Sequence, residues 1–127
     1  MDNLGFPFMT REVRTHQRGA VLMMATVDGS AVAGGTAVTT GLDTGAAAHM
    51  TITENGDGDY TLILSNPGVR FLGLFATSIT DAANVTCALA TDGTSCRVKQ
   101  ITASTGAALA DSDFSLMMMV GHAQDHT

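Results

Sequence analysis

The side chains with the most reactive chemistry in this sequence are two thiols, Cys87 and Cys96. In the hairpin predicted below they lie on one face of the sheet as diagonal neighbours, about 7–8 Å apart at Cα. That separation is at or beyond the limit for a disulfide, and the sequence has no further thiol to complete a zinc site. We therefore expect two buried, reduced cysteines, and a disulfide is the alternative.

An acidic loop is the first candidate for metal binding. Asn55, Asp57 and Asp59 alternate with glycines, as in the first half of a calcium-binding loop. Tyr60 stands where an EF-hand needs glycine, and Asn66 stands where it needs a bidentate glutamate. The residues favour a plain hairpin loop, with a calcium site as the alternative.

Histidines are the second candidate. His122 and His126 could share a metal ion if the end of the chain were helical, but we expect residues 122–127 to form a flexible tail. His16 and His49 have no serine, cysteine or carboxylate nearby in the arrangement of a catalytic triad. We therefore expect no enzymatic activity, no cofactor and no bound metal.

The composition predicts the fold class that must position these side chains. Hydrophobic residues make up 45% of the 127 residues and charged residues 14%, which is typical of one packed domain and not of a disordered chain. The chain is rich in threonine, alanine and glycine and poor in lysine and glutamate, a balance that disfavours helices. An all-β domain is expected.

Turn signals recur about every 8–14 residues, which indicates a sandwich or a barrel. Glycine, asparagine and aspartate mark the turns, as in Asp28-Gly29 and Asn66-Pro67-Gly68. Between them we expect a single antiparallel β-sandwich, jelly-roll-like, with about eight strands, no helix and a bend near Gly73. The predicted strands cover residues 21–27, 31–40, 48–53, 60–65, 69–80, 85–90, 95–101 and 114–120.

Side-chain parity predicts the register of the hairpin that contains both cysteines. With a two-residue turn at residues 92–93, Cys87 faces Val98 and Leu89 faces Cys96. This register collects the apolar residues on one face and the polar residues on the other, so it is favoured.

A second hairpin surrounds the acidic loop. An even loop would place its apolar residues on opposite sides of the sheet. We therefore predict an odd loop, with Gly58 as a left-handed bulge residue, that aligns Ile52 with Tyr60 and Met50 with Leu62.

Charge distinguishes the first residues from the rest of the chain. The net charge of −6 disfavours binding to nucleic acid. Residues 1–20 hold three arginines against two acids, a charge of +1, whereas the other 107 residues hold three basic and ten acidic residues, a charge of −7. We expect an extended arm at 1–18 and a sandwich at 19–121. The arm is expected to dock on an acidic or apolar surface, either its own or that of a partner, and a solvated terminus is the alternative. The candidate partner-binding residues of the arm are Phe6, Phe8, Arg11, Arg14 and Arg18.

Methionines crowd the first and last predicted strands. Consecutive methionines place thioethers on both faces of a strand, so both faces are expected to be covered. A subunit interface would cover the second face, and a further sheet layer of the same chain is the alternative. The candidate interface residues are Met23, Met24, Met117 and Met119.

Targeting signals are absent from the start of the sequence, because residues 1–15 lack a continuous apolar core and a small-residue cleavage site. The apolar runs at 21–25 and 116–120 are far shorter than the roughly 20 residues of a membrane helix. We expect synthesis in a cytoplasm and no interaction with a membrane.

Several short motifs resemble the small β-sandwich virion proteins of tailed bacteriophages. The similarity covers about residues 18–120, and Ser112 replaces a proline that the last motif often has. The motifs are Arg18-Gly19-Ala20-Val21-Leu22, Gly56-Asp57-Gly58-Asp59-Tyr60-Thr61-Leu62-Ile63-Leu64, Phe71-Leu72-Gly73-Leu74-Phe75-Ala76-Thr77 and Ala110-Asp111-Ser112-Asp113-Phe114.

This resemblance implies a structural role in the virion and a homo-oligomer, most often a trimer. We expect a capsid decoration, or cement, protein on the capsid surface that binds the major capsid protein and stabilises the head. The alternative is a head- or tail-fibre adsorption module whose loops at 55–58, 81–84 and 91–94 bind a host glycan or protein. The scarcity of aromatic residues, with one tyrosine and no tryptophan, counts against the alternative.

Overall fold

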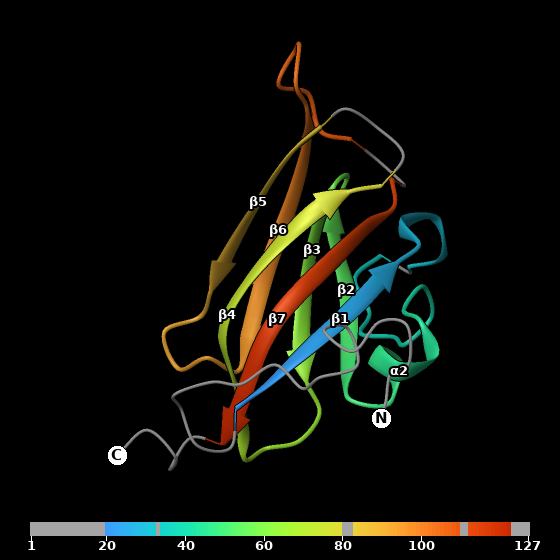
Figure 1. The fold of residues 1–127 in the computed structure, drawn as a ribbon. Helices are drawn as coiled ribbons and strands as arrows, with labels where there is room; N and C mark the ends of the chain where they lie inside the picture. The colour runs from blue at the N-terminus through green and yellow to red at the C-terminus, as the bar shows by residue number, and fades with distance from the viewer. Residues whose placement is uncertain (1–19, 33, 80–82, 110–111, 123–127) are drawn as a thin grey trace, which may run out of the picture.

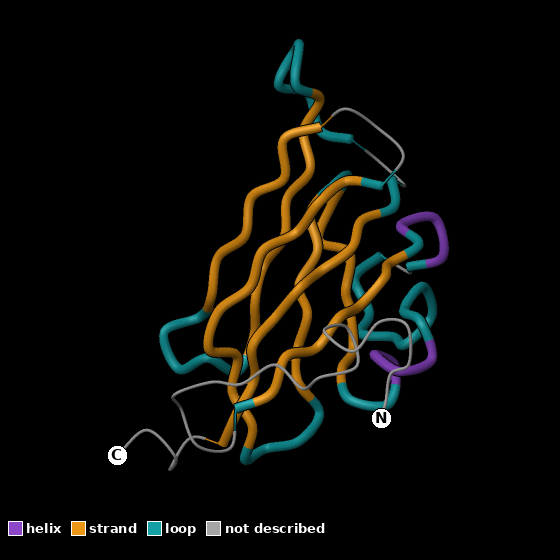
Figure 2. The backbone as a smooth tube through the Cα atoms, viewed as in Figure 1, coloured by secondary structure: helices purple, strands orange, loops and turns teal. Residues whose placement is uncertain are grey.

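The computed structural model describes residues 20–32, 34–79, 83–109 and 112–122 of the chain, which are almost entirely β-strand and turn (Figure 1). Two short helical turns, η1 (Gly29–Ala31) and α2 (Thr44–Ala47), lie on the same side of the molecule (Figure 2). The described strands are β1 (Val21–Val27), β2 (Met50–Gly56), β3 (Asp59–Leu64), β4 (Val69–Ser78), β5 (Ala83–Leu89), β6 (Ser95–Thr102) and β7 (Phe114–His122).

Two antiparallel sheets form the sandwich. One has three strands in the order β1-β7-β4, and the other has four strands in the order β2-β3-β6-β5. The prediction of an all-β sandwich is confirmed. The first and last strands of the body are neighbours in the three-stranded sheet, so both ends of the described chain lie at the same end of the sandwich (Figure 1).

The core lies between the sheets and follows the two-residue period of the strands. On β7, alternate side chains are buried, and Phe114 and Leu116 are fully enclosed. On β3, Tyr60 and Leu62 are equally enclosed from the other side. The rings of Tyr60 and Phe114 meet across the layers with centroids 5.3 Å apart, which joins the two sheets at the centre.

Residues 31–40 form no strand in the described part of this segment, although an edge strand was predicted there. Val38 makes an isolated antiparallel bridge to Ile52, and Gly34 makes an isolated parallel bridge to Glu54. Gly35 adopts a left-handed φ of 73°, which interrupts the extended backbone between the two bridges. The segment therefore runs along the edge of β2 without completing a ladder, and the described residues form seven strands where eight were predicted.

The β5–β6 hairpin has the predicted register. Cys87 pairs with Val98, and Leu89 pairs with Cys96. The turn is wider than the predicted two residues, because the last backbone hydrogen bond across the two strands joins Ala90 N to Ser95 O (3.0 Å) and leaves residues 91–94 as the loop.

The β2–β3 hairpin keeps the predicted faces but not the predicted partners. Met50 pairs with Leu64 and Ile52 with Leu62, two residues beyond the predicted partners. The bulge lies between Glu54 and Gly56, and the ladder continues to the very end of β2 before the chain turns. A shift of two residues leaves every side chain on its original face, so the core assignment stands.

Helix α2 was not predicted from the sequence. Its residue Ala46 is completely buried, so the turn closes the space beside β1 and β2. Asp43, which precedes the helix, accepts a hydrogen bond from the backbone N–H of Thr26 (2.8 Å) and donates its own N–H to the Thr26 carbonyl (3.1 Å). In the described part of the chain, no helix has the length and apolar character needed to span a membrane.

Candidate interaction surfaces

The outer side of the three-stranded sheet is apolar. Met117 and Met119 alternate with the buried side chains of β7, so they point away from the core. They lie opposite Met24 and Leu22 on β1, and Met117 also lies opposite Phe75 on β4. We call Leu22, Met24, Phe75, Met117 and Met119 the outer apolar face.

Water reaches much of this outer apolar face. Met24 is 59% exposed and Phe75 is 60% exposed. The neighbouring outward positions on the three strands are Thr26, Thr77 and Ser115, so the outer apolar face is bordered there by uncharged side chains. A contiguous patch of large apolar side chains on a soluble surface marks a site of interaction.

The outer side of the four-stranded sheet is mostly polar by contrast, with Ile63 as its one exposed large apolar side chain among the described residues. Arg97 and Lys99 stand exposed on β6, and Arg97 donates a hydrogen bond from Nε to Asp59 Oδ1 (2.9 Å) on β3. This hydrogen bond from Arg97 lowers the pKa of the Asp59 carboxyl group below its usual value. The two outer surfaces therefore differ in chemistry, and only that of the three-stranded sheet is suited to an apolar contact.

The four methionines singled out in the sequence do not share one surface. Met24, Met117 and Met119 belong to the outer apolar face. Met23 pairs with the buried Met118 and packs against the core, because adjacent residues of a strand point to opposite sides. Met23 is therefore excluded from an interface built on the outer side.

Sequence reasoning missed the contribution of Phe75. Phe71 and Phe75 are four residues apart and would share a face in a regular strand. The irregularity between Phe71 and Gly73 reverses the alternation, so Phe71 is 3% exposed in the core and Phe75 lies outside. The bend predicted near Gly73 was the one sequence feature that could have placed Phe75 on the outer side. Which side each residue of β4 faces, however, depends on its pairing with β7.

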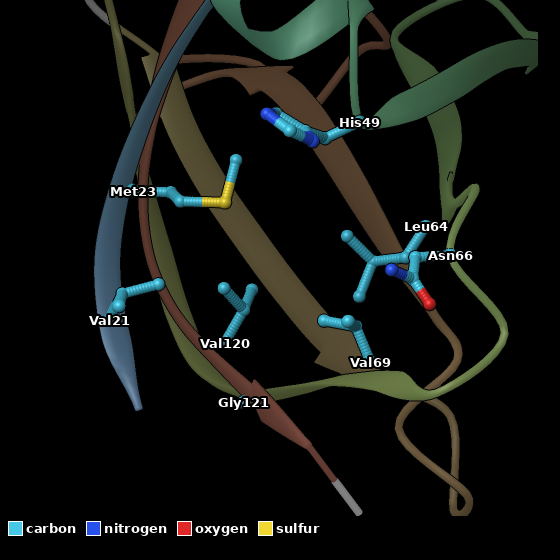
Figure 3. A pocket seen from close by; sticks show the side chains of 8 residues that line it. All are labelled: Val21, Met23, His49, Leu64, Asn66, Val69, Val120 and Gly121. Carbon is cyan, nitrogen blue, oxygen red and sulfur yellow. The ribbon is translucent and has the colours of Figure 1, made fainter. Parts of the chain in front are cut away.

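A cavity of about 400 Å³ opens at the end of the sandwich where β1 begins and β7 ends. Figure 3 shows Val21 and Met23 on one side of it and Leu64 and Asn66 on the other. Its lining is mostly apolar. The lining residues are Val21, Met23, His49, Leu64, Asn66, Val69, Val120 and Gly121.

Several residues predicted to bind partners lie outside the described residues. They are the arm residues Phe6, Phe8, Arg11, Arg14 and Arg18. The candidate metal-binding residue His126 and the tail from residue 123 onward also lie outside. The described chain reaches Ala20 immediately before the cavity, so the arm connects to the sandwich at that end.

Both cysteines are free thiols, as expected, but only Cys96 is buried, and Cys87 is partly exposed. Burial raises the pKa of Cys96 to about 12, and the neighbouring Cys87 adds to the rise. Burial also raises the pKa of Cys87. Such thiols remain protonated at neutral pH, so their role in this fold is packing.

The carboxylates and histidines of the described ranges do not assemble into a metal site. No group of three or more histidine, cysteine, aspartate or glutamate side chains there is close enough to hold an ion. Asp59, the last acid of the glycine-rich loop, bonds instead to Arg97 and to the amide of Asn55 (3.3 Å). These contacts support the hairpin-loop interpretation of that sequence.

The fold and its surfaces define a class of protein, a β-sandwich with one polar and one apolar outer side. The sequence matches no protein-family model, and no curated protein or solved structure shows significant similarity to it.

Proposed function

We propose that the protein is a structural component of a tailed-phage virion, a capsid decoration protein that binds the assembled head and stabilises it. The observation that carries the proposal is the outer apolar face, which Leu22, Met24, Phe75, Met117 and Met119 present to solvent.

Burial is the source of the binding energy in this proposal. Burying a large, fully exposed apolar side chain contributes about 1.5–3 kcal/mol. Met24 and Phe75 are 59% and 60% exposed and the other three residues of the outer apolar face are partly buried, so each contributes only part of that amount. A protein that binds the assembled lattice, and not its separate subunits, stabilises the lattice by mass action, by about 2.7 kcal/mol per site at a free concentration of about 100 times Kd. Decoration thus requires binding to the head and no catalysed reaction.

Charge gives the arm its part in the proposal. Arg11, Arg14 and Arg18 precede an acidic body, so they are suited to acidic patches on the major capsid protein or on a neighbouring copy. Self-association as a homo-oligomer, for which the resemblance implies a trimer, would place several arms on one shell and increase avidity.

The positions of the loops disfavour an adsorption module that uses all three predicted loops, although Ala83, within the predicted loop at 81–84, pairs with Thr102 near the same end of the sheet as the loop at 55–58. Asp59 pairs with Lys99, whereas Ile63 pairs with Ser95, so the loops at 55–58 and 91–94 lie at opposite ends of the four-stranded sheet. A single receptor site cannot use both loops.

The proposal is tested with phage heads that lack the protein, made by placing a stop codon in its reading frame. The double variant Met24→Lys/Phe75→Lys is expected to bind such heads at least about tenfold more weakly than the unchanged protein, because two charges would be buried in the contact. Binding is measured by co-sedimentation.

The matched control is Ile63→Lys/Ala88→Lys, which adds the same charges to the polar outer side of the other sheet, where both residues are exposed. Its binding is expected to equal that of the unchanged protein. Equal head binding by both double variants would reject the outer apolar face as the docking surface. Failure of the unchanged protein to bind heads would reject the function.

A further inference from the structure

We propose that the end cavity is a binding site for the Phe6-Pro7-Phe8 segment of the same chain. The cavity measures about 400 Å³, within the range of sites that hold small ligands or a few side chains. The inference deepens the proposed function, because it assigns the aromatic residues of the arm to the sandwich itself.

The chemistry of the lining fits an apolar peptide. Val21, Val69 and Val120 present aliphatic side chains to the cavity, and the thioether of Met23 adapts to irregular shapes (Figure 3). Asn66 adds a polar group: its Oδ1 accepts a hydrogen bond from the N–H of Gly68 (3.0 Å), which leaves its amide N–H groups able to donate to a peptide carbonyl.

The sequence of the arm fits the same site. Side chains two residues apart lie on one side of an extended chain, so Phe6 and Phe8 can enter one opening together. Pro7 restricts both itself and Phe6 to extended conformations. The chain beyond His122 begins at the same end but carries Ala, Gln, Asp, His and Thr, with no large apolar side chain to fill the cavity.

The length of the arm favours its own cavity over that of a second copy. Residues 9–19 separate the aromatic pair from Ala20, and an extended chain covers about 3.3–3.6 Å per residue, which is ample for a return to Val21. A short tether also gives an effective concentration in the millimolar range. Docking would close residues 9–19 into a loop, which would place its three arginines beside the cavity. That these arginines then contact the shell rests on the proposed function.

A single tryptophan reports on the site, because the natural chain has none. In the full-length variant Phe8→Trp, the indole is expected to emit at shorter wavelength than an exposed tryptophan. Its acrylamide quenching constant should be several-fold lower, by about three times or more, because the cavity walls exclude the quencher. The reference is Ser104→Trp, at an exposed loop position.

A second substitution locates the protected tryptophan. Adding Val69→Asp to Phe8→Trp places a charge in the cavity lining and should raise the quenching constant to that of the reference. The matched control adds Asn84→Asp at an exposed position of β5 and should leave the tryptophan protected. Circular dichroism confirms that each variant is folded.

Three results would overturn the inference: a Phe8→Trp indole as exposed as the reference, protection that survives Val69→Asp, or protection that disappears on dilution to single copies. The last result would mean that the segment occupies the cavity of a neighbouring copy. Head binding by the same variants is measured separately. Normal head binding with an exposed indole would reject only the cavity assignment, and a protected indole without head binding would reject only the proposed function.

Discussion

Burial decides the chemistry of the two thiols. Cys96 is 2% exposed between the sheets, and Cys87 is half-buried on the neighbouring strand. Their raised pKa values follow first from the loss of hydration that a thiolate would suffer there. A residue type associated with catalysis or metal binding serves here as a small apolar side chain.

The raised pKa of Cys96 predicts that the protein loses stability at alkaline pH. This pKa rises from 9.0 to about 12 on folding, so the folded state keeps a proton that the unfolded chain releases. The free energy of unfolding should therefore fall as pH rises from 9 towards 12, by up to about 1.4 kcal/mol per pH unit from this group.

The measurement is urea unfolding in reductant across that pH range, for the unchanged protein and for Cys96→Ala. The stability difference between the two proteins should shrink as pH rises, because only the unchanged protein loses the contribution of the buried thiol. Parallel pH profiles would contradict the prediction.

The turn between β2 and β3 shows how a local backbone requirement becomes part of the tertiary structure. Gly58 has a left-handed φ of 69°, and its carbonyl accepts a hydrogen bond from the N–H of Gln100 on β6 (2.8 Å). The glycine that permits the turn therefore also allows the close approach of a neighbouring strand.

Replacing this glycine should be costly. In Gly58→Ala, the added Cβ would lie 2.6 Å from Gln100 O and 2.9 Å from Leu109 O, in a conformation that disfavours a side chain. We expect a loss of more than about 2 kcal/mol, measured by urea unfolding. Gly56→Ala is the control: its Cβ meets no atom within 4 Å, and a change within about 0.5 kcal/mol is expected. Similar losses for both variants would contradict this account.

At the scale of the whole molecule, the two sides of the three-stranded sheet have different tasks. Its inner side joins the layers through contacts such as the Phe114–Tyr60 ring pair. Its outer side carries the outer apolar face but has no second layer in the described residues. Stability should therefore depend on one side and association on the other.

Two identical substitutions test this division. Phe114→Leu removes part of a fully buried ring and should lower the free energy of unfolding by about 1–3 kcal/mol. Phe75→Leu, at a position 60% exposed, should change it by less than about 0.5 kcal/mol. Thermal and urea unfolding provide the comparison, and equal effects would show that Phe75 is part of the core.

Much of the fold followed from local patterns. Strand β1 has the predicted bounds. The parity of apolar residues also predicted the two faces of the β5–β6 hairpin and the cross-strand partners of its cysteines, Val98 and Leu89, correctly. The β2–β3 partners were wrong by two residues, because a bulge on either strand satisfies the same parity. The short helix at Thr44–Ala47 was not predicted, because its position is fixed by the burial of Ala46 against β1 and β2, which a local sequence pattern does not show.

The sequence by itself determined that this chain forms paired strands, since alternation and turn residues act over a few neighbours. It also placed apolar side chains on both sides of the methionine-rich strands. Only the tertiary structure decided that Met118 lies in the core while Met117 and Met119 face water, and that Phe75 joins them. The physical reason is that a strand apolar on both sides has no local preference between them, so the packing of a distant sheet on one side selects which becomes the interior.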